Sequence, residues 1–214
     1  MIVWHFLYDL SAAGLLPAAL SQSGGMELFR LLIAGSFVSV SGVCVSLSRS
    51  PLRRGLIVCA AALAVSLVTY FFGVPVRWGI LHLLGSCMLL YAAVGNRWAS
   101  LPSTAACGAA LLVFLLTFPL PLYVRVNVPV LFPLGLRTAA FSSTDYYPLL
   151  PWAGLFFAAA AAAKRLEELP PERKYAPAPR FLAWLSRRSL AVYLLHQPVL
   201  LAIAVLLASP AHGA

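Results

Sequence analysis

The segment ELFRLLIAGSFVSVSGVCVSLS, residues 27–48, decides the fold class of this chain. It is almost wholly apolar, and its only charged residues, Glu27 and Arg30, lie near its start. A helix that crosses the hydrocarbon core of a bilayer needs roughly 20 such residues. Valine and serine alternate over residues 38–41, as in a strand, but the length of the apolar run favours a helix. Residues 27–48 therefore predict a membrane-spanning helix.

The composition extends this prediction to the whole chain. Its 214 residues are 62% hydrophobic and 10% charged, whereas a soluble domain is about 25% charged. Further apolar runs cover residues 56–72, 80–94, 103–118 and 189–208, another opens at STDYYPLLPWAGLFF (143–157), and residues 1–10 form a shorter one. We therefore expect an all-α fold: a polytopic integral membrane bundle of about seven transmembrane helices, the first of them short, in a single domain over residues 1–214.

Two local patterns modify this bundle. Gly35 with Ser39, and Gly42 with Ser46, place small residues four apart, which lets a neighbouring helix approach closely. Residues 119–145 contain four prolines, which exclude a regular helix. Because irregular backbone cannot face lipid, we expect this stretch to line a protein cavity or to lie at the surface.

The positive charge indicates an orientation. The formal net charge is +9, but no aromatic-basic motif of nucleic-acid binding is present, so we expect no nucleic-acid partner. The richer set of basic residues lies in the loop at 49–54, at Arg97 and in the charged, proline-rich linker at 164–188. The poorer set is Arg30, Arg77, Arg125 and Arg137. Short loops rich in arginine and lysine stay in the cytoplasm, so the first, third, fifth and seventh helices should run outward.

The opening stretch MIVWHFLYDL carries a candidate catalytic pair. His5 and Asp9 are four residues apart, and on a helix they share a face. Asp9 can then accept a hydrogen bond from one ring nitrogen of His5 and leave the other nitrogen free as a base or nucleophile. The alternative is a helix end at the water interface, where a histidine and an aspartate have little free-energy cost.

Other polar residues lie inside the apolar runs. His82, Asp145 and His196 join the pair at His5 and Asp9, and so many ionisable groups in one small bundle indicate function. At about 1.5 Å rise per residue, His196 should lie deepest. Asp145 also stands where an N-cap of the following helix would lie, and this structural role remains an alternative. The four cysteines are far apart and show no metal spacing, so we expect no metal.

Five stretches, taken in order, carry a family resemblance. They are HFLYDL, FRLLIAGSFVSVSGVCVSLSRS, RWGILHLLG, STDYYPLLPWAGLFFA and LSRRSLAVYLLHQPVL. Together they resemble the heparan-alpha-glucosaminide N-acetyltransferase catalytic-domain family, and in particular its short bacterial branch, long treated as a domain of unknown function. The resemblance implies a membrane enzyme that takes an acetyl group from cytosolic acetyl-CoA and passes it to an amino sugar or related glycan at the outer side. It also implies a place in the bacterial cytoplasmic (inner) membrane.

Within this resemblance each candidate receives a role. His5, oriented by Asp9, would be the base or would carry the acetyl group, and His82 with Asp145 would orient the acceptor. His196 and Gln197 would donate hydrogen bonds to the thioester carbonyl. Arg54, Arg187 and Arg188 would contact the CoA phosphates, or would serve only as a topology signal.

The chain departs from the family in two places. The family opens with an acidic residue and an Arg-Gly pair in the first half of helix one, and this chain starts after that point, so we expect a misassigned start or a truncated helix. Its lysosomal members are thought to use a histidine somewhat downstream of the position that matches His5, and between Leu10 and Arg30 this chain has none. His5 is therefore a substitute candidate.

Two rival functions use the same residues. Intramembrane histidines and aspartates also serve small-molecule transporters and proton relays, although no internal repeat is visible here. A structural membrane subunit is a third alternative, for which buried histidines would be superfluous. The sequence leaves the acceptor and the oligomeric state open, a homo-oligomer included.

Overall fold

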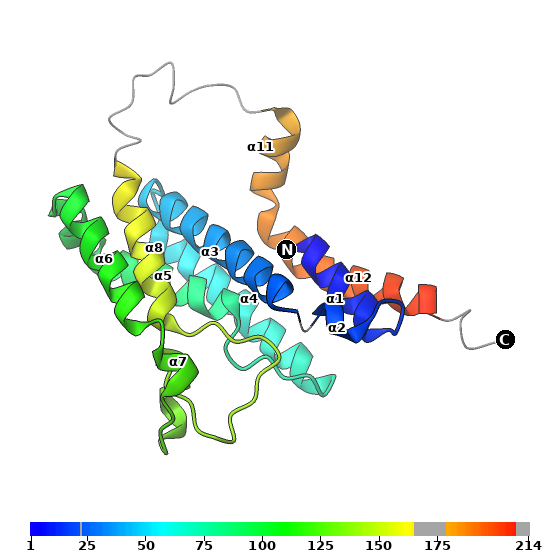
Figure 1. Ribbon diagram of the computed structural model, residues 1–214. Coiled ribbons are helices and arrows are strands. Elements are labelled where there is room, and N and C mark those ends of the chain that lie inside the picture. The colour runs from blue at the N-terminus through cyan, green and yellow to red at the C-terminus, as the bar shows by residue number, and fades with distance from the viewer. Residues whose placement is uncertain (22, 165–178, 209–214) are drawn as a thin grey trace. The chain divides into compact units, whose positions relative to one another are not determined.

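The computed structural model describes residues 1–21, 23–164 and 179–208, and the regular elements among them are helices (Figure 1). This confirms the all-α prediction. The helices that correspond to the predicted apolar runs are α1 (Ile2–Ala12), α3 (Gly24–Ser46), α4 (Pro51–Phe71), α5 (Ile80–Ser100), α6 (Ser103–Thr117), α8 (Leu149–Ala162) and α12 (Ser189–Ala208). The shorter elements are α2 (Ala18–Ser21), α7 (Leu120–Tyr123), the 3-10 helix η1 (Pro129–Leu134) and α11 (Arg180–Arg187).

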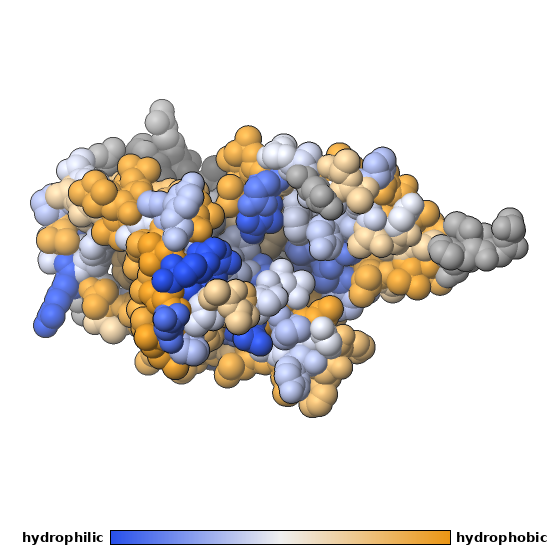
Figure 2. All heavy atoms as spheres, turned by 60° about the horizontal axis from the view of Figure 1, so that its bottom comes forward, coloured by the Kyte–Doolittle hydropathy of each residue, from blue (hydrophilic) through white to orange (hydrophobic). Residues whose placement is uncertain are grey.

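The helices support a polytopic membrane protein, but they do not confirm the number of spans. In the described part of the chain, four helices are long and apolar enough to cross a bilayer: Gly24–Ser46, Pro51–Phe71, Ser103–Tyr123 and Ser189–Ala208. Ile80–Gly95 and Leu149–Ala162 are apolar but shorter, and α1 has only 11 residues. The count of about seven therefore stays a prediction. Apolar side chains cover much of the surface in Figure 2, as lipid-facing helices require.

The chain forms two compact units. The first comprises Met1–Ala34 and Ala176–Ala214. In it α1 packs against α12, α2 lies beside α1, and α11 directly precedes α12. The turn after α1 is closed by the Ser11 hydroxyl, which donates to the Pro17 carbonyl at 3.3 Å.

The second unit, Gly35–Tyr175, is a row of packed helices. The helix α8 lies between α6 and α5, and α5 pairs with α4. Helices α4 and α5 run antiparallel, because Gly55 contacts Leu89 while Ser66 reaches His82 further along.

Glycines allow the closest contacts of this row. A Cβ at Gly154 of α8 would lie 2.7 Å from the Ala110 carbonyl oxygen and 2.7 Å from the Phe114 amide nitrogen of α6. A Cβ at Gly42 of α3 would collide with the Phe156 carbonyl of α8. The predicted close approach at Gly42 is thus confirmed, whereas Gly35 has only ordinary contacts.

The proline-rich stretch at 119–145 holds no long helix, as predicted, and only α7 and η1 interrupt it. Its end is bound to the turn before α5: the Thr144 amide donates to the Pro75 carbonyl at 3.2 Å, and the Tyr147 amide to the Trp78 carbonyl at 3.0 Å. After η1 the chain turns at Gly135, whose φ is +101°. The stretch therefore covers the N-terminal end of α5.

The linker predicted over residues 164–188 needs a correction. Its last part is the helix α11, because residues 180–187 contain no proline and a regular helical pattern of apolar and basic residues. Residues 165–178 of the linker and His212 lie outside the described part of the chain.

Candidate functional site

The first unit brings four of the polar residues together at the contact between α1 and α12. His5 and Asp9 come from α1, and His196 and Gln197 come from the middle of α12. The rings of His5 and His196 lie edge to face, with 5.0 Å between their centroids. Asp9 is buried, with 5% of its surface exposed, and the other three are half-buried. The sequence did not indicate which helix would pack against α1.

The surroundings of His196 fix its tautomer. Its Nδ1 lies in hydrogen-bond contact with the carbonyl oxygen of Tyr193, one turn earlier in α12. A carbonyl oxygen can only accept, so Nδ1 carries the proton and Nε2 of the neutral ring keeps its lone pair. That Nε2 is buried and has no hydrogen-bond partner among the described residues. In the neutral ring, Nε2 is therefore the nitrogen that could act as a general base or a nucleophile.

Asp9 does not pair with His5. Its carboxylate accepts from the Gln197 side-chain amide, with Nε2 at 3.2 Å from one oxygen and 3.3 Å from the other. No hydrogen bond joins Asp9 to His5 in the described part of the chain. The predicted pair is wrong because spacing along one helix gives a shared face, whereas the side chains turn to whatever the neighbouring helix offers. Here α12 offers an amide, which satisfies a buried carboxylate.

The predicted donors to a thioester carbonyl, His196 and Gln197, have N–H groups engaged within the protein, and their role toward the thioester stays a prediction. The protonated nitrogen of His196 is already bonded to Tyr193, and the Gln197 amide already donates to Asp9. What these two residues leave unpartnered are acceptors: Nε2 of His196 and Oε1 of Gln197, both buried. Among the described residues of this unit, the indole Nε1 of Trp4 is a buried donor without a partner, and its ring centroid lies 4.9 Å from that of His5.

The unpartnered atoms of Trp4, His196 and Gln197 define what we call the α1–α12 cluster, together with His5 and Asp9. Buried polar atoms in a native protein are normally hydrogen-bonded, so unpartnered ones indicate a site for a ligand or an ordered water. Two acceptors and one donor suit a group that both donates and accepts, such as an amine beside a carbonyl.

His82 belongs to the second unit, where both its ring nitrogens are in use. The Gly79 amide donates to Nδ1 at 3.3 Å, so the proton lies on Nε2, which contacts the Ser66 hydroxyl at 3.2 Å. That hydroxyl donates in turn to the Val76 carbonyl at 2.6 Å. His82 thus closes the N-terminal end of α5 and ties it to α4.

Asp145 serves the same end of α5. Its Oδ2 accepts from the Ile80 amide at 3.1 Å. The predicted alternative, an N-cap of the following helix, is wrong: α8 begins after Pro148 and has no side-chain cap. A carboxylate at a helix N-terminus satisfies an otherwise unbonded amide and complements the helix dipole.

An aromatic cluster surrounds this end of α5. Trp78 lies 5.4 Å from His82 and 6.1 Å from Phe132, measured between ring centroids. The Tyr146 hydroxyl donates to the Phe132 carbonyl at 2.7 Å, and the Arg137 guanidinium lies over the Tyr146 ring. Burial raises the pKa of Tyr146 to about 12, although Arg137 works in the opposite direction. The hydroxyl is therefore a permanent donor that fixes η1.

The remaining candidates lie at the surface. Arg54 of the second unit and Arg187 and Arg188 of the first have exposed side chains. Arg188 lies over the Trp184 ring at 5.4 Å. Among the described residues, no group of three or more histidine, cysteine, aspartate and glutamate side chains could hold a metal. The cysteines are free: Cys44, Cys59, Cys87 and Cys107.

Sequence reasoning missed Trp4, a member of the α1–α12 cluster, and Tyr193, whose backbone carbonyl holds His196. Trp4 gave no signal, because a tryptophan in an apolar run is ordinary. Tyr193 acts through its backbone carbonyl, which no residue type reveals. The spacing of Tyr193 and His196, three apart on a helix, was a usable signal for such a bond.

Comparison with known proteins gives one match. The family model described as heparan-alpha-glucosaminide N-acetyltransferase, catalytic, matches residues 1–198. No curated protein and no solved structure matches the chain.

Proposed function

Because this chain belongs to the heparan-alpha-glucosaminide N-acetyltransferase catalytic family, a family of membrane acetyltransferases that use acetyl-CoA as donor, we propose that it transfers an acetyl group from cytosolic acetyl-CoA to an amino sugar or related glycan at the outer side of the bacterial inner membrane. The observation that carries the proposal is the unpartnered Nε2 of His196, buried beside His5 in a helix of the matched region.

The reaction needs a base, and His196 is our candidate. The acceptor amine forms a bond to the acetyl carbon, the bond from that carbon to the CoA sulfur breaks, and the amine loses a proton. Nε2 of His196 takes this proton and returns it to the CoA thiolate. The carbonyl of Tyr193 supports this by holding the proton of the neutral ring on Nδ1.

The other members of the α1–α12 cluster orient the reactants. Oε1 of Gln197 accepts from the amine, and Nε1 of Trp4 donates to the acetyl oxygen as negative charge develops there. Asp9 holds the Gln197 amide in this orientation. His5 remains the second candidate for the base or the acetyl carrier, because its ring lies against that of His196.

The candidates outside this cluster receive supporting roles. His82 and Asp145 fix the N-terminal end of α5 and the stretch before α8, and they stay our candidates for orienting the acceptor. Arg54, Arg187 and Arg188 have the charge and exposure for contacts with the CoA phosphates.

Acetyl transfer from labelled acetyl-CoA to a panel of amino sugars tests the proposal, with the full chain in membrane vesicles. We expect labelled N-acetyl product from the unaltered protein, and thermal stabilisation of the purified protein by CoA. His196→Ala should remove the product and keep the stabilisation. Absence of both product and stabilisation, together with uptake of a small solute into sealed vesicles, would favour a transporter instead.

A further inference from the structure

The helix α11 and its basic residues have no role in the proposed function beyond two possible phosphate contacts. It is an eight-residue helix that ends one residue before α12 begins. Isolated helices shorter than about 12 residues are marginal in water. A helix this short therefore needs a surface to lie on.

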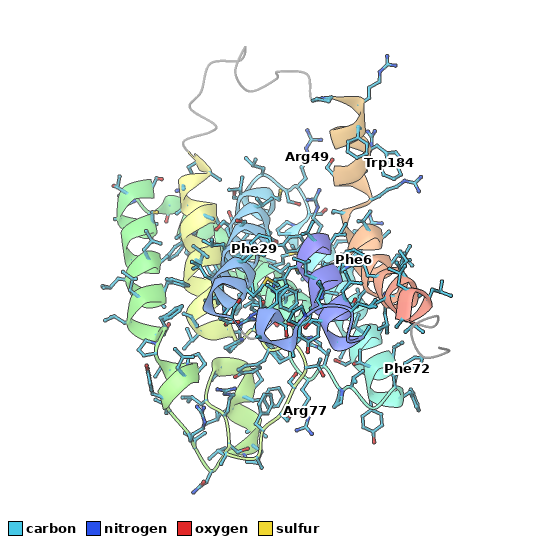
Figure 3. All side chains as sticks on the ribbon, turned by 45° about the vertical axis from the view of Figure 1, so that its right-hand side comes forward. Phe6, Phe29, Arg49, Phe72, Arg77 and Trp184 are labelled. Atoms are coloured by element: carbon cyan, nitrogen blue, oxygen red, sulfur yellow. The ribbon has the colours of Figure 1, made fainter. Side chains whose placement is uncertain are left out.

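The side chains of α11 show what kind of surface fits. Phe181 and Trp184 stand one turn apart and stack, with 6.4 Å between ring centroids. They are 67% and 46% exposed, and Trp184 projects from the helix in Figure 3. Exposing two large aromatic rings to water is unfavourable in free energy. We therefore expect this face of α11 to contact an apolar environment.

The charges of α11 are all positive. Arg180 and Arg187 lie two turns apart on one face, next to Trp184, and Arg188 lies over the Trp184 ring. Residues 176–208 contain no aspartate, glutamate or lysine. Basic side chains beside interfacial aromatic rings are typical of helices that lie in the headgroup region of a bilayer.

The position of α11 in the chain places this face at a membrane. It adjoins Ser189–Ala208, which is long and apolar enough to span a bilayer. With only Arg188 between the two helices, α11 must lie close to the bilayer surface at which α12 begins. Figure 1 shows α11 (orange) turning away from the direction of α12, as a surface helix before a span does.

From these observations we propose that α11 is an interfacial helix that binds anionic phospholipid headgroups through Arg180, Arg187 and Arg188 and inserts Phe181 and Trp184 into the bilayer surface. The inference rests on α11 and α12 alone and is independent of acetyl transfer. A CoA phosphate carries the same charge as a headgroup, but it gives no reason for two exposed aromatic rings. Each arginine near an anionic surface strengthens membrane binding by roughly fivefold.

Hydrogen–deuterium exchange of the full chain in nanodiscs tests this. One set of discs contains phosphatidylcholine alone, and the other contains equal parts of phosphatidylcholine and phosphatidylglycerol. We expect the backbone amides of residues 181–188 to exchange at least about tenfold more slowly in the anionic discs, as two or more arginine contacts would give. Equal exchange in the two lipid mixtures would overturn the proposal.

Two variants separate charge from anchoring. Arg180→Gln with Arg187→Gln and Arg188→Gln should abolish the difference between the two lipids. The matched control, Arg49→Gln with Arg53→Gln and Arg97→Gln, removes three arginines elsewhere and should keep it. Phe181→Ser with Trp184→Ser should speed exchange of 181–188 in both lipids. Exchange in α4 and α12 reports whether each variant is folded.

A last arm distinguishes a membrane headgroup from a soluble phosphate. CoA is added to the unaltered protein in phosphatidylcholine discs. We expect far less slowing of exchange over residues 181–188 than anionic lipid gives, even with CoA phosphates on Arg187 and Arg188, because CoA leaves Phe181 and Trp184 in water. If CoA slows exchange there as much as anionic lipid does, α11 is part of a nucleotide site and the lipid proposal fails.

Discussion

His196 is the residue whose chemistry depends most directly on one contact, the bond from Nδ1 to the Tyr193 carbonyl. We expect His196→Ala to lower the rate of acetyl transfer by at least about 100-fold, the usual contribution of a general base. His196→Gln should not restore activity, because an amide cannot take a proton at neutral pH. The measurement is transfer from labelled acetyl-CoA in membranes with matched protein levels.

The control for His196 is the histidine of the C-terminal tail. His212→Ala removes an imidazole of the same kind and should leave the rate unchanged. Full activity of His196→Ala would make His196 a packing residue and would move the reacting role to His5.

Asp9 and Gln197 should behave as one unit. Gln197→Leu leaves the buried Asp9 carboxylate without its amide donor, which should cost about 1–3 kcal/mol of stability. Asp9→Leu removes the acceptor instead. The double variant should cost less than the sum of the two single variants, since neither polar group then remains unpaired. Thermal unfolding of the detergent-solubilised variants gives the three values, and strictly additive losses would disprove the coupling.

At the residue scale, the sequence predicted the polar residues of the candidate site better than it predicted their hydrogen-bond partners. The occurrence of His5, Asp9 and His196 in apolar runs follows from composition alone. The pairing of Asp9 with Gln197 depends on α1 packing against α12, which are separated by almost the whole chain. Spacing along one helix contains no information about such a neighbour.

At the element scale, glycine makes the contact between α6 and α8 possible. Gly154→Ala places a methyl group against the backbone of α6, and we expect it to destabilise the protein by about 1–3 kcal/mol. Gly108→Ala, on α6, is the matched control: a Cβ there has open space, so the change should be neutral or stabilise the helix by up to about 1 kcal/mol. Thermal unfolding compares the two variants, and equal midpoints would contradict the close packing.

Sequence reasoning was most successful in predicting the long helices. Apolar runs of sufficient length gave α3, α4 and α12, because helix formation inside lipid depends mainly on local composition. The helix α11 was missed because its apolar run, FLAWL at 181–185, is too short to predict a span and lies between arginines at the end of a linker. For Asp145, the capping alternative named the wrong helix, because a side chain in an irregular stretch caps whichever N-terminus lies beside it, here that of α5.

At the scale of the whole molecule, the charges indicate an orientation. In the second unit, Lys164 donates to the Leu101 carbonyl at 2.9 Å, so the end of α8 lies beside the turn between α5 and α6. Arg97 lies in the last helical turn of α5, next to this connection, whereas Arg77 lies just before the opposite end of α5. We therefore predict that the linker at 164–188 lies in the cytoplasm.

Protease accessibility measures this orientation. Trypsin added to sealed inverted vesicles should cut within residues 164–188, and trypsin added to intact right-side-out cells should not. Cleavage of the linker in the intact cells, with protection in the inverted vesicles, would reverse the orientation and place the richer set of basic residues outside.

The turn after η1 limits how the chain can vary by mutation. Gly135 excludes side chains for two separate reasons: its φ of +101° strains any L residue, and a Cβ would lie 2.8 Å from the Leu150 carbonyl oxygen. At Gly73, φ is +73° but a Cβ would have open space, so only the backbone strain applies there. In a saturation library sorted for folded protein, position 73 should accept asparagine, which tolerates this backbone region, while position 135 should retain glycine alone. Asparagine at both positions with equal frequency would show that the turn has room to adjust.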